Sequence, residues 1–122
     1  MRDELAHPQA PETVRKWIDV PLLWLEARSP TGRSAHKELE ALDEGERAAL
    51  LLAIFLSADL LLVDDRAGAR VARRMGLRVT GTLGLLQFAA ERGLVDLADT
   101  FESLKRTNFR CRQEIMDRLL LN

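Results

Sequence analysis

The sequence predicts a single α/β domain over residues 1–122 with a short parallel sheet, and three observations support this prediction. The chain has 122 residues, which is the size of one ordinary domain. Its apolar content of 47% is enough for one hydrophobic core. Between Asp59 and Ala90, a strand pattern and a helix pattern alternate twice. Parallel strands need such crossover helices, so this order favours a parallel sheet covered by helices.

The first half of the chain is predicted to be mostly helical. Pro8 and Pro11 separate two short helices, because proline cannot continue a helix and restricts the residue before it. A stronger helix follows, apolar nearly all round, which must be covered on most sides. The expected elements are helices at Met1–Ala6 and Glu12–Asp19, a strand at Leu22–Ala27, a loop at Arg28–Ser34, and helices at Ala35–Leu42 and from Asp43 to about Ser57.

The second half carries the alternating pattern. The continuous apolar run Ala58–Val63 is typical of a buried parallel strand. Gly76 and Gly93 stand where the two following helices are expected to end. The expected elements after the first strand are a helix at Arg66–Met75, a strand at Leu77–Thr80, and helices at Leu83–Arg92, Val95–Arg106 and Arg112–Leu121.

Composition and charge exclude several classes of protein. The net charge of −1 does not mark a nucleic-acid binder, so any such site would be a local patch. Cys111 is the single cysteine, which excludes an intrachain disulfide. With no signal-peptide pattern at the start, this favours the cytoplasm. The apolar run Ala48–Leu56 is too short to cross a bilayer, so no membrane association is expected.

Two adjacent aspartates, Asp64 and Asp65, follow the first predicted strand, at the end where open parallel sheets bind ligands. Close carboxylates repel each other unless a cation lies between them. Mg²⁺ and Mn²⁺ take oxygen ligands, often one or two carboxylates plus water and phosphate. The pair is therefore a candidate site for metal-assisted phosphodiester hydrolysis. The alternative is that one aspartate caps the helix beginning near Arg66, and one would suffice for this.

Other charged residues also allow two interpretations. Asp43 and Glu46 match a capping box, which on local sequence favours a structural role for Glu46. Glu4 by itself is typical of a solvated helix charge. Four arginines on one helical face would hold an RNA backbone, or they form a solvated or ion-paired face. The few aromatic residues stand mostly at apolar positions, which predicts core rather than base stacking. The four arginines are Arg66, Arg70, Arg73 and Arg74.

Three stretches, Leu42–Glu46, Ala58–Arg66 and Gly76–Leu86, together resemble the PIN-domain superfamily in their order along the chain. More closely, the chain is similar to toxin-like bacterial and archaeal PIN proteins that are uncharacterised and described as predicted nucleic-acid-binding proteins. The early segments Asp3–Leu5 and Val14–Trp17 also fit this subgroup. The resemblance therefore covers nearly the whole chain.

This resemblance implies an α/β/α sandwich and an Mg²⁺- or Mn²⁺-dependent ribonuclease, in many members the toxin of a type II toxin–antitoxin pair. RNA and an antitoxin protein are the implied partners. By position, Glu4, Glu46 and Asp64, with Asp65 beside it, match the acidic residues of the family. The resemblance thus implies all four as metal ligands, and Glu46, Asp64 and Asp65 as catalytic residues.

The chain departs from the family pattern at its beginning. Family members start with a strand that ends in an aspartate, and no such strand precedes Met1. We therefore expect an N-terminally truncated fold with an incomplete acidic site and an open sheet edge. A start site further upstream, a remnant gene, or a homodimer that covers the edge would each explain this. Two functions stay open: a metal-dependent ribonuclease, or a catalytically inactive interaction or assembly module.

Overall fold

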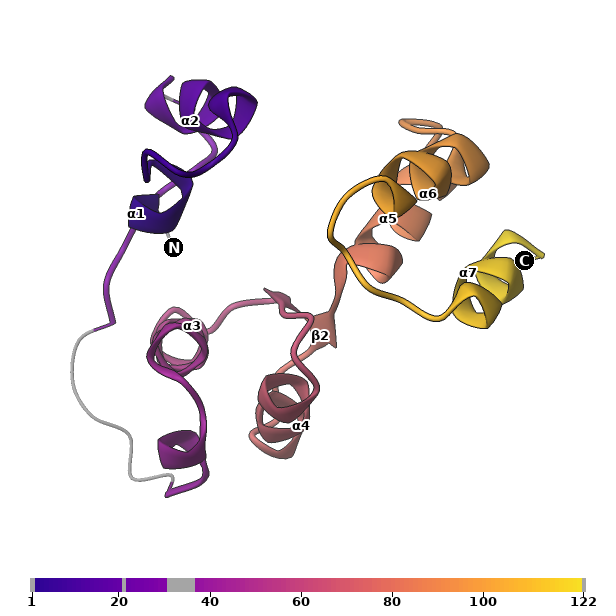
Figure 1. The fold of residues 1–122 in the computed structure, drawn as a ribbon. Helices are drawn as coiled ribbons and strands as arrows, with labels where there is room; N and C mark the ends of the chain where they lie inside the picture. The colour runs from indigo at the N-terminus through magenta and orange to yellow at the C-terminus, as the bar shows by residue number, and fades with distance from the viewer. Residues whose placement is uncertain (1, 21, 31–36, 122) are drawn as a thin grey trace. The chain divides into compact units, whose positions relative to one another are not determined.

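The computed structural model describes residues 2–20, 22–30 and 37–121. The chain divides into two compact units, Met1–Ala58 and Asp59–Asn122. The elements, labelled as in Figure 1, are α1 (Arg2–Leu5), α2 (Glu12–Asp19), the 3₁₀ helix η1 (Lys37–Ala41), α3 (Glu44–Phe55), β1 (Leu61–Leu62), α4 (Arg66–Arg74), β2 (Val79–Thr80), α5 (Thr82–Glu91), α6 (Leu97–Lys105) and α7 (Gln113–Leu120).

In the first unit, α1 and α2 pack against each other, and the predicted strand Leu22–Ala27 does not form. The Leu25 amide donates to the Leu22 carbonyl at 3.1 Å, which closes a turn. The ring centroids of Trp17 and Trp24 lie 6.2 Å apart. The strand prediction was wrong because this local aromatic pair and turn take the place of a strand partner.

The second part of this unit joins η1 to α3. Asp43 caps α3, since its Oδ1 accepts from the Glu46 amide at 3.0 Å, as the capping-box pattern predicts. The Arg47 guanidinium donates to the carbonyls of Leu39 at 3.1 Å and Leu42 at 2.9 Å. These bonds tie the end of η1 to the first turn of α3, where Glu46 lies. Of the predicted segment Ala35–Leu42, residues 35 and 36 lie outside the described residues, as do residues 31–34 of the predicted loop.

The second unit contains the predicted strand–helix–strand order. β1 pairs in parallel with β2, with Leu61 opposite Val79 and Leu62 opposite Thr80, and α4 is the crossover between them. This confirms the short parallel sheet. Both strands are shorter than predicted, while the helix bounds lie within about two residues of the expected ones, the usual uncertainty of helix ends.

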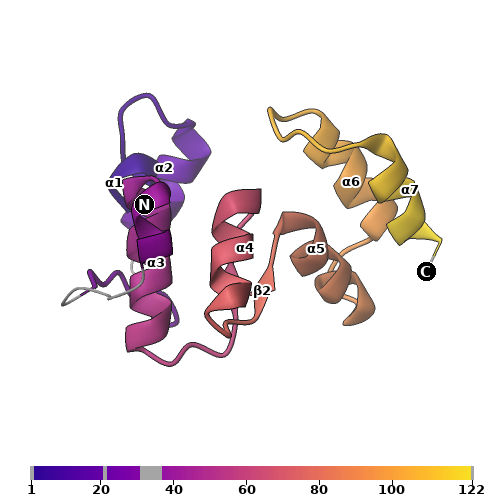
Figure 2. The ribbon, with the colours of Figure 1, turned by 90° about the horizontal axis from the view of Figure 1, so that it is seen from below.

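Helices α5, α6 and α7 complete the second unit. α6 packs against both α5 and α7 (Figures 1 and 2). Phe101 on α6 is 1% exposed, and Met116 on α7 is buried as well. Gly76 and Gly93 follow α4 and α5 with φ of 82° and 73°, so they provide the left-handed residue that ends a helix, as predicted. None of the helices that the structure describes is long and apolar enough to span a bilayer.

Burial along the apolar segments differs from the prediction. Leu62 in β1 is 53% exposed, so the expectation of a buried strand is wrong. A continuous apolar run is buried only where both sheet faces are covered, and β1 has β2 as its described neighbour on one side. On α3, Leu50 is fully buried but Ile54 and Phe55 are exposed, so cover on most sides is not observed either.

Candidate acidic site and basic face

Asp65 is the N-cap of α4. Its Oδ2 accepts a hydrogen bond from the Gly68 amide at 2.7 Å, and its backbone is extended, as at most N-caps. Gly68 is buried and closely packed, since a Cβ there would lie 3.3 Å from Val63 Cγ2. The structural alternative for this aspartate is therefore correct, and one of its oxygens is engaged by the helix.

Asp64 is hydrogen-bonded to the first residue of α5. Its Oδ1 accepts from the Thr82 amide at 2.8 Å, and its Oδ2 accepts from the Thr82 hydroxyl at 2.6 Å. Thr82 is the first residue of α5, where the helix dipole favours a negative charge. Both aspartates thus contact a helix N-terminus, Asp65 that of α4 and Asp64 that of α5. That one aspartate suffices to cap α4 therefore does not leave the other without a structural role.

Thr82 is a partner of Asp64 that the sequence pattern does not predict. The signal that identifies it is the sheet register. Residues paired between β1 and β2 differ by 18 in number, and Asp64 and Thr82 differ by 18 as well. Because parallel strands end at the same edge of a sheet, equal offsets from the paired residues place the two side chains together. Without the register, the 18 positions between Asp64 and Thr82 do not indicate that the two residues are in contact.

Gly81 provides the space for the Asp64 carboxylate. A Cβ at this position would lie 2.6 Å from Asp64 Oδ1, closer than real Cβ contacts. Gly81 has φ of −107°, so its backbone does not require glycine. Its lack of a side chain therefore matters for the neighbouring carboxylate rather than for the conformation of the turn.

Gly81→Ala is expected to lower the free energy of unfolding of the second unit by about 1 kcal/mol, since the carboxylate must turn away from Thr82. Gly45→Ala, on α3 of the first unit, is the control for a glycine-to-alanine change without a close contact, because a Cβ there would meet nothing closer than 3.9 Å. That control is expected to stabilise by about 0.4–1 kcal/mol through the unfolded state. Urea unfolding followed by circular dichroism measures both changes.

The same substitution in an Asp64→Ala background tests the cause of the effect. With the carboxylate gone, Gly81→Ala should lose its penalty and behave like the control. A penalty that persists in this background, or a stabilising Gly81→Ala in the natural sequence, would contradict the close approach of Asp64 and Gly81.

Glu4 and Glu46 lie in the first unit. Glu4 is exposed on α1, and Glu46 is half-buried in the first turn of α3. Asp64 and Asp65 lie in the second unit, so the association of all four carboxylates stays a prediction. Among residues 2–20, 22–30 and 37–121, no group of three or more His, Cys, Asp or Glu side chains is positioned to hold a metal ion.

The two carboxylates after β1 have the chemistry that a hard cation needs. Asp64 and Asp65 are both exposed, and each carboxylate offers about four lone-pair positions. The hydrogen bonds described above use only part of this capacity. Mg²⁺ usually keeps several waters and is bound by one or two carboxylates together with substrate phosphate. The donor set at this edge therefore fits Mg²⁺ or Mn²⁺.

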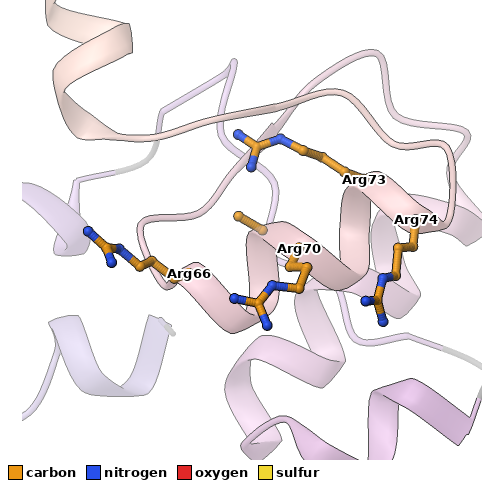
Figure 3. A pocket seen from close by; sticks show the side chains of 5 residues that line it. Arg66, Arg70, Arg73 and Arg74 are labelled. Carbon is orange, nitrogen blue, oxygen red and sulfur yellow. The ribbon is translucent and has the colours of Figure 1, made fainter.

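The four arginines predicted to share a face of α4 line one open depression of about 510 Å³. Figure 3 shows their guanidinium groups spread around it rather than gathered at one point. The opposite side of α4 is apolar and buried, with Val71 and Ala72 in the core. Because the apolar side is buried, the four arginines face solvent, and this basic face begins with Arg66, directly after Asp65. The lining residues are Arg66, Ala69, Arg70, Arg73 and Arg74.

The expectation that the aromatic residues belong mostly to the core is only partly correct. Phe101 is buried, but Trp24 is 74% exposed and Phe88 is 52% exposed. The Arg92 guanidinium lies 4.7 Å from the centroid of the Phe88 ring, a cation–π contact on the surface of α5. Neither Trp24 nor Phe88 lines the depression on α4.

Comparison with known proteins gives one family. A family model described as a PIN domain matches residues 2–122, which is nearly the whole chain. No curated protein and no solved structure shows a significant match. The family match agrees with the strand–helix–strand order of the second unit and covers the first unit as well.

Proposed function

The chain belongs to the PIN-domain family, and from this premise we propose that it is a metal-dependent ribonuclease. PIN domains generally depend on a divalent metal and act on nucleic acids. One observation carries the proposal for this chain: two consecutive, exposed aspartates, Asp64 and Asp65, follow the carboxyl end of β1. This is the place where open parallel sheets bind their ligands.

In this proposal, Asp64 is the principal ligand of Mg²⁺ or Mn²⁺, and Asp65, Glu46 and Glu4 complete the acidic site. A bound divalent ion lowers the pKa of its water and neutralises charge on the phosphate. Thr82 fixes the direction of the Asp64 carboxylate through its amide and hydroxyl, so that the free lone pairs keep one orientation. Such preorganisation of a charged group supports catalysis because less rearrangement is needed during the reaction.

The basic face of α4 holds the RNA in the same proposal. Arg66 is the residue directly after Asp65, so the face begins beside the acidic site. Arginine presents a planar set of donors that matches phosphate, and four such residues supply a local positive surface on a chain of net charge −1. The residues assigned to RNA binding are Arg66, Arg70, Arg73 and Arg74.

The proposal includes a biological setting. The protein acts in the cytoplasm as the toxin of a type II pair, with an antitoxin protein as its partner, and it forms a homodimer. Exposed apolar side chains support a protein partner, since contiguous exposed apolar surface often marks an interaction site. Leu60, just before β1, is 49% exposed, and Leu62, in β1, is 53% exposed. Light scattering of the purified chain separates a monomer from a dimer.

Metal removal tests the activity. Labelled RNA incubated with the purified chain should be cleaved in Mn²⁺ or Mg²⁺, and chelation with EDTA should abolish the cleavage, with recovery when the metal is returned. Calorimetry of Mn²⁺ binding in the absence of RNA provides a second readout. No cleavage and no metal binding would overturn the nuclease proposal for this chain.

The second candidate is a catalytically inactive interaction or assembly module. The observation that favours it is that Asp65 caps α4 and Asp64 contacts the start of α5, so both carboxylates have a structural role without a metal. In this case, substitution of Asp64 would change the stability and leave RNA binding and partner binding as they were. The metal titration described above separates the two candidates.

A further inference from the structure

A second open depression adjoins the basic face of α4. It has a volume of about 380 Å³ and lies in the same compact unit. Arg66 lines both depressions, so they meet at this side chain. The second depression also brings in Arg110 and Arg112, from the segment just before α7. Neither residue belongs to the basic face of α4, from which they are separated by more than 30 positions in the sequence.

The two depressions together make a continuous basic strip. Its first part follows α4 for about 12 Å from Arg66 to Arg74, at about 1.5 Å per residue. Its second part runs from Arg66 to the segment around Cys111. Neither set of lining residues contains a carboxylate. The members of the strip are Arg66, Arg70, Arg73, Arg74, Arg110 and Arg112.

This composition fits a nucleic-acid backbone better than a protein surface. The centre of a protein–protein interface is depleted of charge and rich in large apolar side chains. The strip is the reverse, because its lining holds only Ala69, Cys111 and Ile115 beside the arginines. Guanidinium groups in a lining that holds no carboxylate side chain match a row of phosphates, each of which accepts paired hydrogen bonds from arginine.

We propose that Arg110 and Arg112 extend the RNA-binding face of α4 into one track for the phosphate backbone, with Arg66 at the junction. This inference rests on the proposed function for its ligand and adds residues that the function itself does not require. Among the residues that the structure describes, no aromatic residue lines either depression, so the track offers no base-stacking platform there. The backbone is therefore bound without regard to base sequence.

Fluorescence anisotropy with labelled single-stranded oligo-U and oligo-A, in EDTA so that no cleavage occurs, tests the track. The double variant Arg110→Gln with Arg112→Gln is expected to bind both oligomers roughly tenfold more weakly. The slope of log affinity against log salt should fall by about 0.7 for each arginine removed. The two oligomers should lose affinity equally.

The matched control is Arg106→Gln with Arg118→Gln, which removes the same charge from exposed residues that line neither depression. It is expected to bind within about twofold of the natural chain. Equal losses in both double variants would mean that only net charge matters, and this would overturn the track. Displacement of RNA by a glutamate oligomer of equal charge and at equal concentration would also overturn it, in favour of an acidic protein ligand.

The outcome also separates this inference from the proposed function. Metal-dependent cleavage with unchanged binding in the Arg110 and Arg112 variant would leave the nuclease intact and remove the track. Binding that depends on these arginines, without cleavage in Mn²⁺, would keep the track and remove the nuclease. Absence of binding to either oligomer by the natural chain would overturn the track.

Discussion

Asp64→Asn is expected to reduce Mn²⁺-dependent RNA cleavage by roughly a hundredfold or more, because it removes the charge of the residue that we propose as the principal metal ligand. The free energy of unfolding should change by about 1 kcal/mol or less. Asparagine keeps the shape of aspartate and still accepts from the Thr82 amide through Oδ1. The Thr82 hydroxyl, which donates to Asp64 Oδ2, can instead accept from the asparagine Nδ2, since a hydroxyl does both. Cleavage rate and urea unfolding are the two measurements.

Asp65→Asn is the matched control for that substitution. Asparagine and aspartate are equally good N-caps, so the bond from the Gly68 amide and the start of α4 are retained. Since one oxygen of Asp65 already accepts from the Gly68 amide, we expect Asp65→Asn to lose less cleavage activity than Asp64→Asn. Cleavage at the natural rate by the Asp64 variant, with Mn²⁺ present and the fold intact, would contradict the role of Asp64.

Phe101→Ala is expected to lower the free energy of unfolding by about 3–5 kcal/mol, through lost burial and the cavity that remains. Phe101 is 1% exposed on α6, the helix that packs against both α5 and α7. Small domains are stable by about 5–15 kcal/mol, so this change removes a large share of the total. Urea unfolding followed by far-ultraviolet circular dichroism measures it.

Phe88→Ala provides the comparison for this large effect. Phe88 is 52% exposed and contacts Arg92, so its removal should cost about 1 kcal/mol or less. Both tryptophans, Trp17 and Trp24, lie in the first unit, so circular dichroism is the signal for unfolding of both phenylalanine variants. Equal losses for the two phenylalanine variants would contradict the core position of Phe101.

Helix positions were predictable because local chemistry marks their ends. Asp43 caps α3, and Gly76 and Gly93 end α4 and α5 with positive φ, as their place in the sequence indicated. The strand–helix–strand order likewise followed from the apolar run before Asp64. These signals lie within a few residues of the feature that they specify, so a single sequence is sufficient to read them.

Other features depend on contacts between distant residues. The Leu22–Ala27 segment has the composition of a strand but forms a turn beside Trp17. The pairing of Asp64 with Thr82 requires the register of β1 and β2, and the nearness of Arg66 to Arg110 requires the path of the chain between them. Periodicity records which side chains favour burial, and it does not record which segment covers them.

The pairing of β1 with β2 also determines how stably the Asp64 carboxylate is held. The two strands pair over two residues each, and the flanking bonds from the Leu61 and Val63 amides reach Arg78 and Thr80. If this short ladder opens, Asp64 and Thr82 separate while α4 and α5 remain helical. Local opening of such a ladder costs less free energy than global unfolding. The orientation of the Asp64 carboxylate therefore depends on one small strand pair, and any ligand that bridges the two strand ends would shift the equilibrium toward the paired state by mass action.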